Sequence, residues 1–181
     1  MATVLTIGRP ILFRQVRVGR RGVHFNIEKF RTMTNERDAL GRLLPDDART
    51  PRLMRFIRRS RLDELPQLFA IIRGDMSLVG PRPLLPETVA SFDRLGERRC
   101  AVAPGLTGWA QVNGNSRLDD GQKLALDLWY IDHQSFWLDL RILAMTLGVL
   151  LFGERVRQDR VAQAEAHCAR LRRPGLEGRA A

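Results

Sequence analysis

The stretch RRSRLDELPQLFAIIRGDMSLVGPRP, residues 58–83, combines charged residues of both signs with a short apolar run and two prolines near its end. Two acids, Asp63 and Glu64, stand side by side directly after several arginines. A short apolar run follows, and then Arg82 stands between two prolines. Charged residues are rarely buried in a protein core, so the stretch indicates a site that contacts charged groups.

The acid pair precedes a predicted helix start. Pro66 disfavours helical geometry at the residue before it, yet proline suits the first position of a new helix. We therefore expect a break near Asp63 and Glu64, and then a helix that ends at Gly74. The amide groups and the dipole at a helix N-terminus favour negative charge, which should keep a carboxylate ionised and can also hold a phosphate.

Arg82 lies in the sequence GPRP, where the flanking prolines restrict its backbone. Less entropy is therefore lost when its guanidinium binds two phosphate oxygens. The alternative is an arginine in a surface turn. The acid pair also has a simpler interpretation, chance or helix capping, because adjacent acids recur at Asp46–Asp47 and Asp119–Asp120.

Two short β-rich segments, 11–18 and 23–30, are separated by GRRG, which predicts a hairpin with glycines at the turn. Alternate residues of the second strand share one face, where two apolar residues precede two cations. This face consists of Phe25, Ile27, Lys29 and Arg31. The two cations are either a solvated strand end or part of a charged site.

A basic amphipathic helix is predicted from Thr50 to Arg61, after a polar loop over residues 34–50. Threonine can cap a helix, and Pro51 suits the first helical position. The apolar stripe consists of Leu53, Phe56 and Ile57. The arginines on the other side are either solvated or in contact with phosphates or anionic lipid.

The remaining chain is expected to be mostly helical. Helices are predicted over residues 86–100, 118–134 and 136–152, and the segment 103–116, rich in Gly, Pro and Asn, is predicted to be a structured loop. Residues 153–181 are expected to be a frayed helix and tail without a function. The predicted fold class is α+β, a single α-rich domain with a small N-terminal β-hairpin and amphipathic interfacial helices.

Composition points to an anionic partner, because the 181-residue chain carries a formal net charge of +10. Candidates are nucleic acid, anionic lipid and phosphorylated substrates. The first residues lack the pattern of a signal peptide, and no apolar run reaches the roughly 18 residues of a spanning helix. Any membrane contact is therefore expected to be peripheral. Cys100 and Cys168 are far apart and suggest neither a disulfide framework nor a zinc site.

Four stretches resemble the bacterial sugar transferases, a family of monotopic phosphoglycosyl transferases. They are ILFRQVRVG, EKFRTM, RLDELPQLFAIIRGDMSLVGPRP and VAPGLTGWAQVNG, in that order. The resemblance covers roughly residues 8–152, interpreted as the catalytic domain, and leaves 153–181 as an arginine-rich C-terminal tail. Family members usually carry an apolar re-entrant membrane helix before the first stretch. Only ten residues precede ILFRQVRVG here, so we expect that helix to be absent.

The resemblance implies the activity. A sugar 1-phosphate passes from a UDP-sugar to a polyprenyl (undecaprenyl) phosphate, which initiates exopolysaccharide, capsule or glycan assembly. The implied location is the cytoplasmic face of the bacterial inner membrane, peripheral or monotopic, with an anionic membrane surface as a partner. Nucleic acid is not expected as a partner, and no pattern in the sequence selects one sugar or one oligomeric state.

The resemblance also assigns roles to residues. Asp63 becomes the nucleophile that forms a covalent phosphosugar intermediate, and Glu64 the partner that binds Mg²⁺. Arg82 and Arg58 become phosphate contacts, with Lys29 as a supporting cation and Arg31 as a weaker candidate beside it. Attack by a carboxylate splits the transfer into two displacements, in which alignment and charge stabilisation do most of the catalysis.

This chemistry needs no general base, so the scattered His24, His133 and His167 are expected to be structural or solvated. Gln111 and Asn113 are weak candidates for contacts to a nucleobase or sugar, and amides that stabilise the loop are an equal alternative. Several aromatic residues suit either a bilayer interface or the core. They are Trp109, Trp129, Tyr130, Phe136 and Trp137.

Two other classes of function compete with the enzyme. The charge and the pI near 11.2 are also typical of a nucleic-acid-binding protein, which would give the acid pair no role. A truncated, catalytically silent relative that acts as a scaffold is the second alternative. The ordered motifs favour the enzyme.

Overall fold

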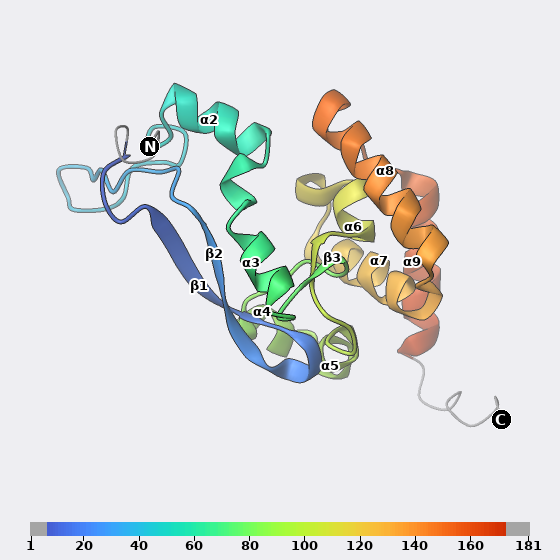
Figure 1. Cartoon of the computed structure of the whole chain (residues 1–181). Helices are drawn as coiled ribbons and strands as arrows, with labels where there is room; N and C mark the ends of the chain where they lie inside the picture. The colour runs from blue at the N-terminus through green and yellow to red at the C-terminus, as the bar shows by residue number, and fades with distance from the viewer. Residues whose placement is uncertain (1–6, 173–181) are drawn as a thin grey trace. The chain divides into compact units, whose positions relative to one another are not determined.

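A computed structural model describes residues 7–172 (Figure 1). Their contacts divide them into two compact units. The first holds the described residues up to Val16 together with Asn26–Arg73. The second holds Arg17–Phe25 and the described residues from Gly74 onward. The sequence pattern does not predict this division.

The predicted hairpin is confirmed. Strand β1, Leu12–Val18, pairs with β2, His24–Phe30, through a short 3-10 turn at Arg20–Gly22. Gly22 has a φ of 77°, a backbone conformation that glycine adopts without the steric cost of a side chain. Of the predicted face of β2, Ile27 is the residue that is buried.

Helix α2, Arg52–Arg59, confirms the predicted basic helix, but its start differs. The Thr50 hydroxyl donates a hydrogen bond to the Asp46 carbonyl oxygen at 2.6 Å and does not cap the helix. Pro51 occupies the N-cap position instead of the first helical position. The prediction for Thr50 was wrong because its side chain stabilises the preceding loop.

The buried face of α2 also differs from the predicted stripe. Met54 is completely buried, whereas Leu53 is 50% and Phe56 65% exposed. Periodicity identifies the apolar side of a helix, but the neighbouring elements determine which residues are covered. The predicted stripe therefore remains largely at the surface of the first unit.

The predicted break at the acid pair is confirmed. Arg61 adopts a left-handed conformation with a φ of 57°, and a 3-10 turn follows at Leu62–Glu64. Helix α3 then runs over Gln67–Ile72, and Gly74, with a φ of 84°, ends this segment. The acids therefore lie in a tight turn directly before the helix.

In the second unit, strand β3, Ser77–Val79, pairs in parallel with β4, Gly105–Thr107. The segment 103–116 is thus not only a loop, as predicted, because it contains a strand and the short helix α6, Trp109–Val112. Its glycines allow a close approach of two backbones. A Cβ atom at Gly108 would lie 2.0 Å from the carbonyl oxygen of Gly80.

The single helix predicted over residues 86–100 was also wrong. Two short helices, α4 at Pro86–Ala90 and α5 at Asp93–Arg99, take its place. Gly96 allows them to fold back closely, since a Cβ atom there would lie 2.1 Å from the carbonyl oxygen of Val89. Close packing between the two halves replaces continuous helical hydrogen bonding.

Helices α7, Asp120–His133, and α8, Phe136–Phe152, confirm the two later helices. The Asp119 carboxylate accepts a hydrogen bond from the Gln122 backbone amide at 2.8 Å, and the Gln122 side chain accepts one in return from the Asp119 amide. This reciprocal cap satisfies amide groups that have no partner inside the helix.

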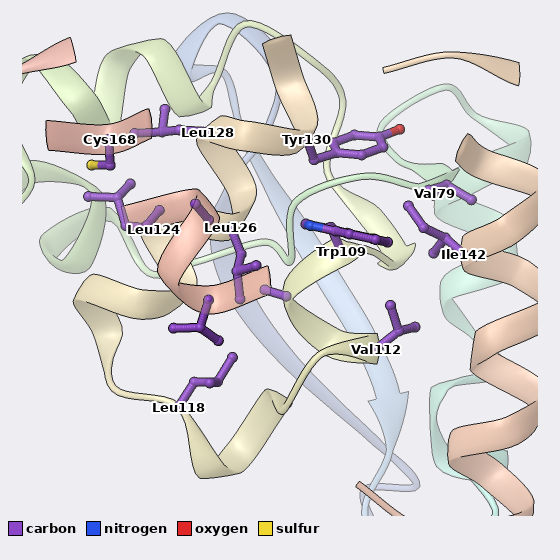
Figure 2. Close-up of a cluster of buried hydrophobic side chains, with 14 residues drawn as sticks. Val79, Trp109, Val112, Leu118, Leu124, Leu126, Leu128, Tyr130, Ile142 and Cys168 are labelled. Carbon is purple, nitrogen blue, oxygen red and sulfur yellow. The ribbon is translucent and has the colours of Figure 1, made fainter. Parts of the chain in front are cut away.

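Helix α9, Gln158–Leu171, corrects the expectation of a frayed tail. It packs along α7, and its residues Val161, Ala164 and Cys168 are at most 4% exposed. They join the core of the second unit, which Figure 2 shows around Trp109 and the leucines of α7. The sequence did not predict this helix because the whole segment from Glu154 onward is rich in arginine, which drew attention away from the apolar spacing in α9.

The structure confirms the α+β class, with a small antiparallel sheet near the N-terminus and mostly helix elsewhere. Among residues 7–172, no helix has both the length and the apolar character needed to cross a bilayer.

We expect Val161→Ala to lower the free energy of unfolding by roughly 1–3 kcal/mol, because it leaves a cavity between α9 and α7. Urea unfolding followed by circular dichroism measures this change. The matched control is Gln163→Ala on the exposed side of α9, which should change stability by about 0.5 kcal/mol at most. Equal effects of the two substitutions would contradict the packing of α9.

Candidate active site

Both acids of the pair are buried in the turn before α3. Asp63 is 7% exposed, and its Oδ1 atom has no hydrogen-bond partner among the described residues. Glu64 is 9% exposed and accepts a hydrogen bond from Arg61 at 3.3 Å. A buried carboxylate oxygen without a partner is costly, and such groups are concentrated at functional sites.

Burial raises the pKa of Asp63, and the neighbouring charge of Glu64 raises it further. The positive charges of Lys29 and Arg58 act in the opposite direction without cancelling the effect. The helix start was expected to favour the ionised form of the acid. Desolvation, the largest effect on this carboxyl, acts against that form.

The predicted cations of the first unit meet at one cavity of about 250 Å³. Lys29, Arg31 and Arg58 all line it. Arg31 also donates a hydrogen bond to the backbone oxygen of Ile7 at 2.7 Å, so part of its guanidinium stabilises the chain. The cavity therefore combines positive charge from β2 and α2, which suits an anionic group.

Arg82 belongs to the second unit and lines a different cavity, of about 230 Å³. Both flanking prolines are buried, which supports the predicted restriction of its backbone. Its carbonyl oxygen also accepts a hydrogen bond from the Arg99 guanidinium. The GPRP segment is therefore held by packing and by a side chain.

The two amide candidates differ in their surroundings. The Asn113 side chain is fully buried, donates to the Trp109 carbonyl oxygen at 2.8 Å and accepts from Arg160 at 3.1 Å. Both amide atoms of Gln111 are buried without a hydrogen-bond partner among the described residues. Asn113 thus stabilises its loop, whereas Gln111 has its hydrogen-bonding groups available.

The loop after α6 is also held by the chain beyond α8. The Glu154 carboxylate accepts hydrogen bonds from the side chains of Asn115 and Ser116, each at 2.5 Å. The Arg160 guanidinium lies 4.7 Å from the centre of the Trp109 ring. These contacts fix a loop whose residues line the 230 Å³ cavity.

Sequence reasoning missed a buried ion pair in the second unit. Arg99 and Asp127 lie 2.8 Å apart, and their side chains are each 3% exposed. Burial raises the pKa of Asp127, and the charge of Arg99 opposes that effect. The available signal was a lone acid in the apolar run LALDL, residues 124–128, where both flanking leucines are buried.

Two of the histidines, His133 and His167, contact other side chains. His133 stacks on the Trp129 ring with 4.2 Å between ring centres. His167 lies 2.7 Å from an Asp132 oxygen, and Asp132 also accepts from Arg98 at 2.8 Å. The packing of α9 on α7 creates this cluster, which fits a structural role. The remaining one, His24, is exposed.

The aromatic candidates separate into two groups. Trp109 and Tyr130 are core residues, each 3% exposed, and Trp129 stacks on Trp109. Phe136 and Trp137, at the start of α8, are 74% and 75% exposed. Only the second pair suits a bilayer interface.

The acid pair fits Mg²⁺ by its chemistry. Within residues 7–172, no group of three or more Asp, Glu, His or Cys residues could hold a metal ion. Mg²⁺ commonly uses one or two carboxylates and completes its coordination with water and phosphate. Asp63 and Glu64, one of them with an unpartnered oxygen, provide that minimal set.

We expect the stability difference between Asp63→Asn and the wild type to depend on pH. The folded-state pKa of Asp63 is raised above its ordinary value of 3.8, so ionisation penalises the folded state. The variant should therefore gain relative stability as the pH rises from about 3.8 through the raised pKa, and the gain should then level off.

Urea unfolding between about pH 3 and pH 8 measures this difference. The control is Asp47→Asn, which changes an exposed acid in the same unit. A flat profile for Asp63→Asn would contradict the raised pKa.

Comparison with known proteins supplies the family. The model of the family described as bacterial sugar transferase matches residues 1–153. An uncharacterized sugar transferase, EpsL of Bacillus subtilis (strain 168), is 48% identical over 161 residues, which cover 89% of this chain and 80% of that protein.

Two longer relatives carry names that state an activity. An undecaprenyl-phosphate glucose phosphotransferase of Komagataeibacter xylinus is 44% identical, over 79% of this chain and 30% of its own length. An undecaprenyl-phosphate galactose phosphotransferase of Salmonella typhimurium (strain LT2) is 38% identical, over 80% of this chain and 34% of its own length. This chain thus spans most of EpsL and about a third of the other two. The match across residues 1–153 and the identity to EpsL show that the chain belongs to the bacterial sugar transferase family.

Proposed function

We propose that this chain is a phosphoglycosyl transferase that moves a sugar 1-phosphate from a UDP-sugar to undecaprenyl phosphate. The names of several relatives support this activity, among them a UDP-glucose:undecaprenyl-phosphate glucose-1-phosphate transferase of Xanthomonas campestris pv. campestris. The observation that carries the proposal is the buried Asp63 carboxylate, with an unpartnered oxygen, under the influence of Lys29 and Arg58.

The proposed first step uses Asp63 as a nucleophile. A carboxylate oxygen attacks the phosphorus that bears the sugar, and the bond from that phosphorus to the bridging oxygen breaks. The electron pair leaves with uridine monophosphate, and an acyl phosphate links Asp63 to the sugar. In the second step an oxygen of undecaprenyl phosphate attacks the same phosphorus and releases the Asp63 carboxylate.

Burial of Asp63 has two consequences for this step. Partial removal of water makes the carboxylate a stronger nucleophile when it is ionised, and the raised pKa means that it loses its charge earlier as the pH falls. Lys29 and Arg58 favour the ionised form, so they also favour the reactive form.

The cations also stabilise the negative charge of the substrate phosphates. Phosphoryl transfer depends mainly on alignment and on electrostatic stabilisation of the oxygens around phosphorus. Lys29, Arg31 and Arg58 supply positive charge at the cavity of the first unit. Arg82, in the second unit, has the restrained backbone that a phosphate-binding arginine benefits from.

Glu64, with Asp63 beside it, is the proposed Mg²⁺ ligand. The bound ion would neutralise part of the diphosphate charge and so reduce its repulsion of the attacking carboxylate. Glu64 is held in position by its hydrogen bond from Arg61.

We predict that Asp63→Asn abolishes both product formation and the covalent adduct, because an amide cannot act as this nucleophile. The assay incubates the chain with a panel of labelled UDP-sugars, Mg²⁺ and undecaprenyl phosphate in detergent. It follows release of uridine monophosphate, and mass spectrometry searches for a phosphosugar on the peptide that contains residue 63. Asp47→Asn should behave like the wild type.

Normal transfer by Asp63→Asn would refute the assigned role. A wild-type chain with neither turnover nor adduct across the panel would favour a silent scaffold instead.

Membrane association is the second part of the proposal. Helix α2 presents exposed arginines together with Leu53 and Phe56, and α8 presents an exposed apolar surface. The surface of α8 includes Phe136, Trp137, Leu147, Leu151 and Phe152. Such helices can lie at the interface of the cytoplasmic leaflet, where the lipid acceptor of exopolysaccharide synthesis would be reached.

We predict that the chain co-sediments with vesicles containing phosphatidylglycerol and that salt above about 0.3 M releases much of it by screening the arginines. The double substitution Phe136→Ser and Trp137→Ser should reduce the binding that remains at high salt. Equal binding to neutral and anionic vesicles would contradict the role of the basic surface.

A further inference from the structure

The 230 Å³ cavity of the second unit has polar groups that the proposed phosphoryl chemistry does not use. Its lining includes Arg82, Phe92, Arg99, Gln111, Lys123 and Asp127. Ligand sites for drug-sized molecules enclose roughly 300–1,000 Å³. The smaller volume here suits a single ring rather than a whole nucleotide sugar.

Three buried atoms around this cavity have no hydrogen-bond partner among the described residues. They are Oε1 and Nε2 of Gln111 and Oδ1 of Asp127. Gln111 is only 8% exposed and Asp127 only 2%. Leaving such buried groups unsatisfied is costly, so a ligand that satisfies them would gain affinity.

Both side chains are held in place. Asp127 uses its other oxygen, Oδ2, to accept from Arg99 at 2.8 Å, and Arg99 also donates to the Arg82 carbonyl oxygen. The Gln111 side chain packs against Gly108, where a Cβ atom would lie 2.7 Å from Oε1. The polar atoms are therefore positioned before any ligand binds, which lowers the entropic cost of binding.

The pattern of donors and acceptors discriminates between the parts of a nucleotide sugar. The three atoms comprise two acceptors, Gln111 Oε1 and Asp127 Oδ1, and Gln111 Nε2, which carries two N–H donors. The pairing edge of uracil presents two acceptors around a single donor, so it can donate to only one of the two protein acceptors. Sugar hydroxyls both donate and accept, and they can satisfy both acceptors.

We propose that this cavity binds the hydroxyl groups of the transferred sugar, and that Gln111 and Asp127 select the sugar. This inference rests on the proposed function. Phe92 supplies a ring surface for the C–H groups of the pyranose. Arg82 and Lys123 at the same cavity supply positive charge for the phosphate attached to the sugar.

The test is isothermal titration calorimetry of the full chain in detergent. The ligands are UDP and four UDP-sugars: UDP-glucose, UDP-galactose and their N-acetylamino derivatives. Gln111→Met keeps the volume and removes the hydrogen bonds. The matched control is Gln163→Met, at an exposed position of α9. We expect Gln111→Met to weaken the best-binding UDP-sugar about tenfold, and to leave UDP affinity unchanged.

Two results would overturn this inference while leaving the proposed function intact. If Gln111→Met weakens UDP as much as the UDP-sugar, the cavity binds the base. If it weakens neither, water alone satisfies Gln111. Should Gln111→Met fail to fold, Gln111→Glu removes the donor at nearly constant volume, and the same comparison applies. A wild-type chain that binds neither UDP nor any UDP-sugar would instead refute the proposed function.

Discussion

The burial of the Asp63 carboxylate is the constraint on which the candidate active site depends. Removing this group from water disfavours its charge, and Glu64 beside it adds repulsion. The opposing charges of Lys29 and Arg58, together with a backbone hydrogen bond, make ionisation less costly. The left-handed turn at Arg61 and the 3-10 turn after it place the acid where these charges act on it. A conformation of this kind is maintained at the expense of stability, which is typical of catalytic carboxylates.

The second unit also contains a buried carboxylate, but its surroundings differ from those of Asp63. Asp127 is also buried with one oxygen unpartnered, but its other oxygen is held by Arg99. A fixed carboxylate with a committed partner is suited to recognition, because its position varies little and its charge is balanced. At Asp63 the charges of Lys29 and Arg58 and a backbone hydrogen bond favour ionisation, while Oδ1 has no hydrogen-bond partner among the described residues, and this carboxylate is suited to reaction. Two buried acids thus differ in role through what surrounds them.

Local patterns predicted the elements whose signals are local. The hairpin, the break before Pro66 and the helices α7 and α8 follow from turn glycines, proline and apolar spacing. The predictions failed where packing between distant segments determines the local structure. The glycines of 103–116 indicated a loop, whereas they serve close contact with Gly80, and α9 was taken for a tail although it completes the core.

The residues of the candidate sites also divide into those that local sequence identifies and those that only the fold brings together. Asp63 and Glu64 are adjacent in the chain, so the sequence could identify them, and the family resemblance supplied their roles. Arg99 and Asp127 are 28 residues apart, and only the fold brings them together. Burial likewise raises the pKa of Asp63, an effect that the sequence did not predict, because desolvation depends on tertiary packing that no motif encodes.

The contacts from Glu154 and Arg160 to the loop after α6 lie beyond residue 153, where the family match ends. Within the family, divergence of that C-terminal segment can therefore shift the loop while every recognisable motif stays the same. A chimaera that joins residues 1–153 to another protein's C-terminal helix would keep the motif residues but lose these contacts to the loop.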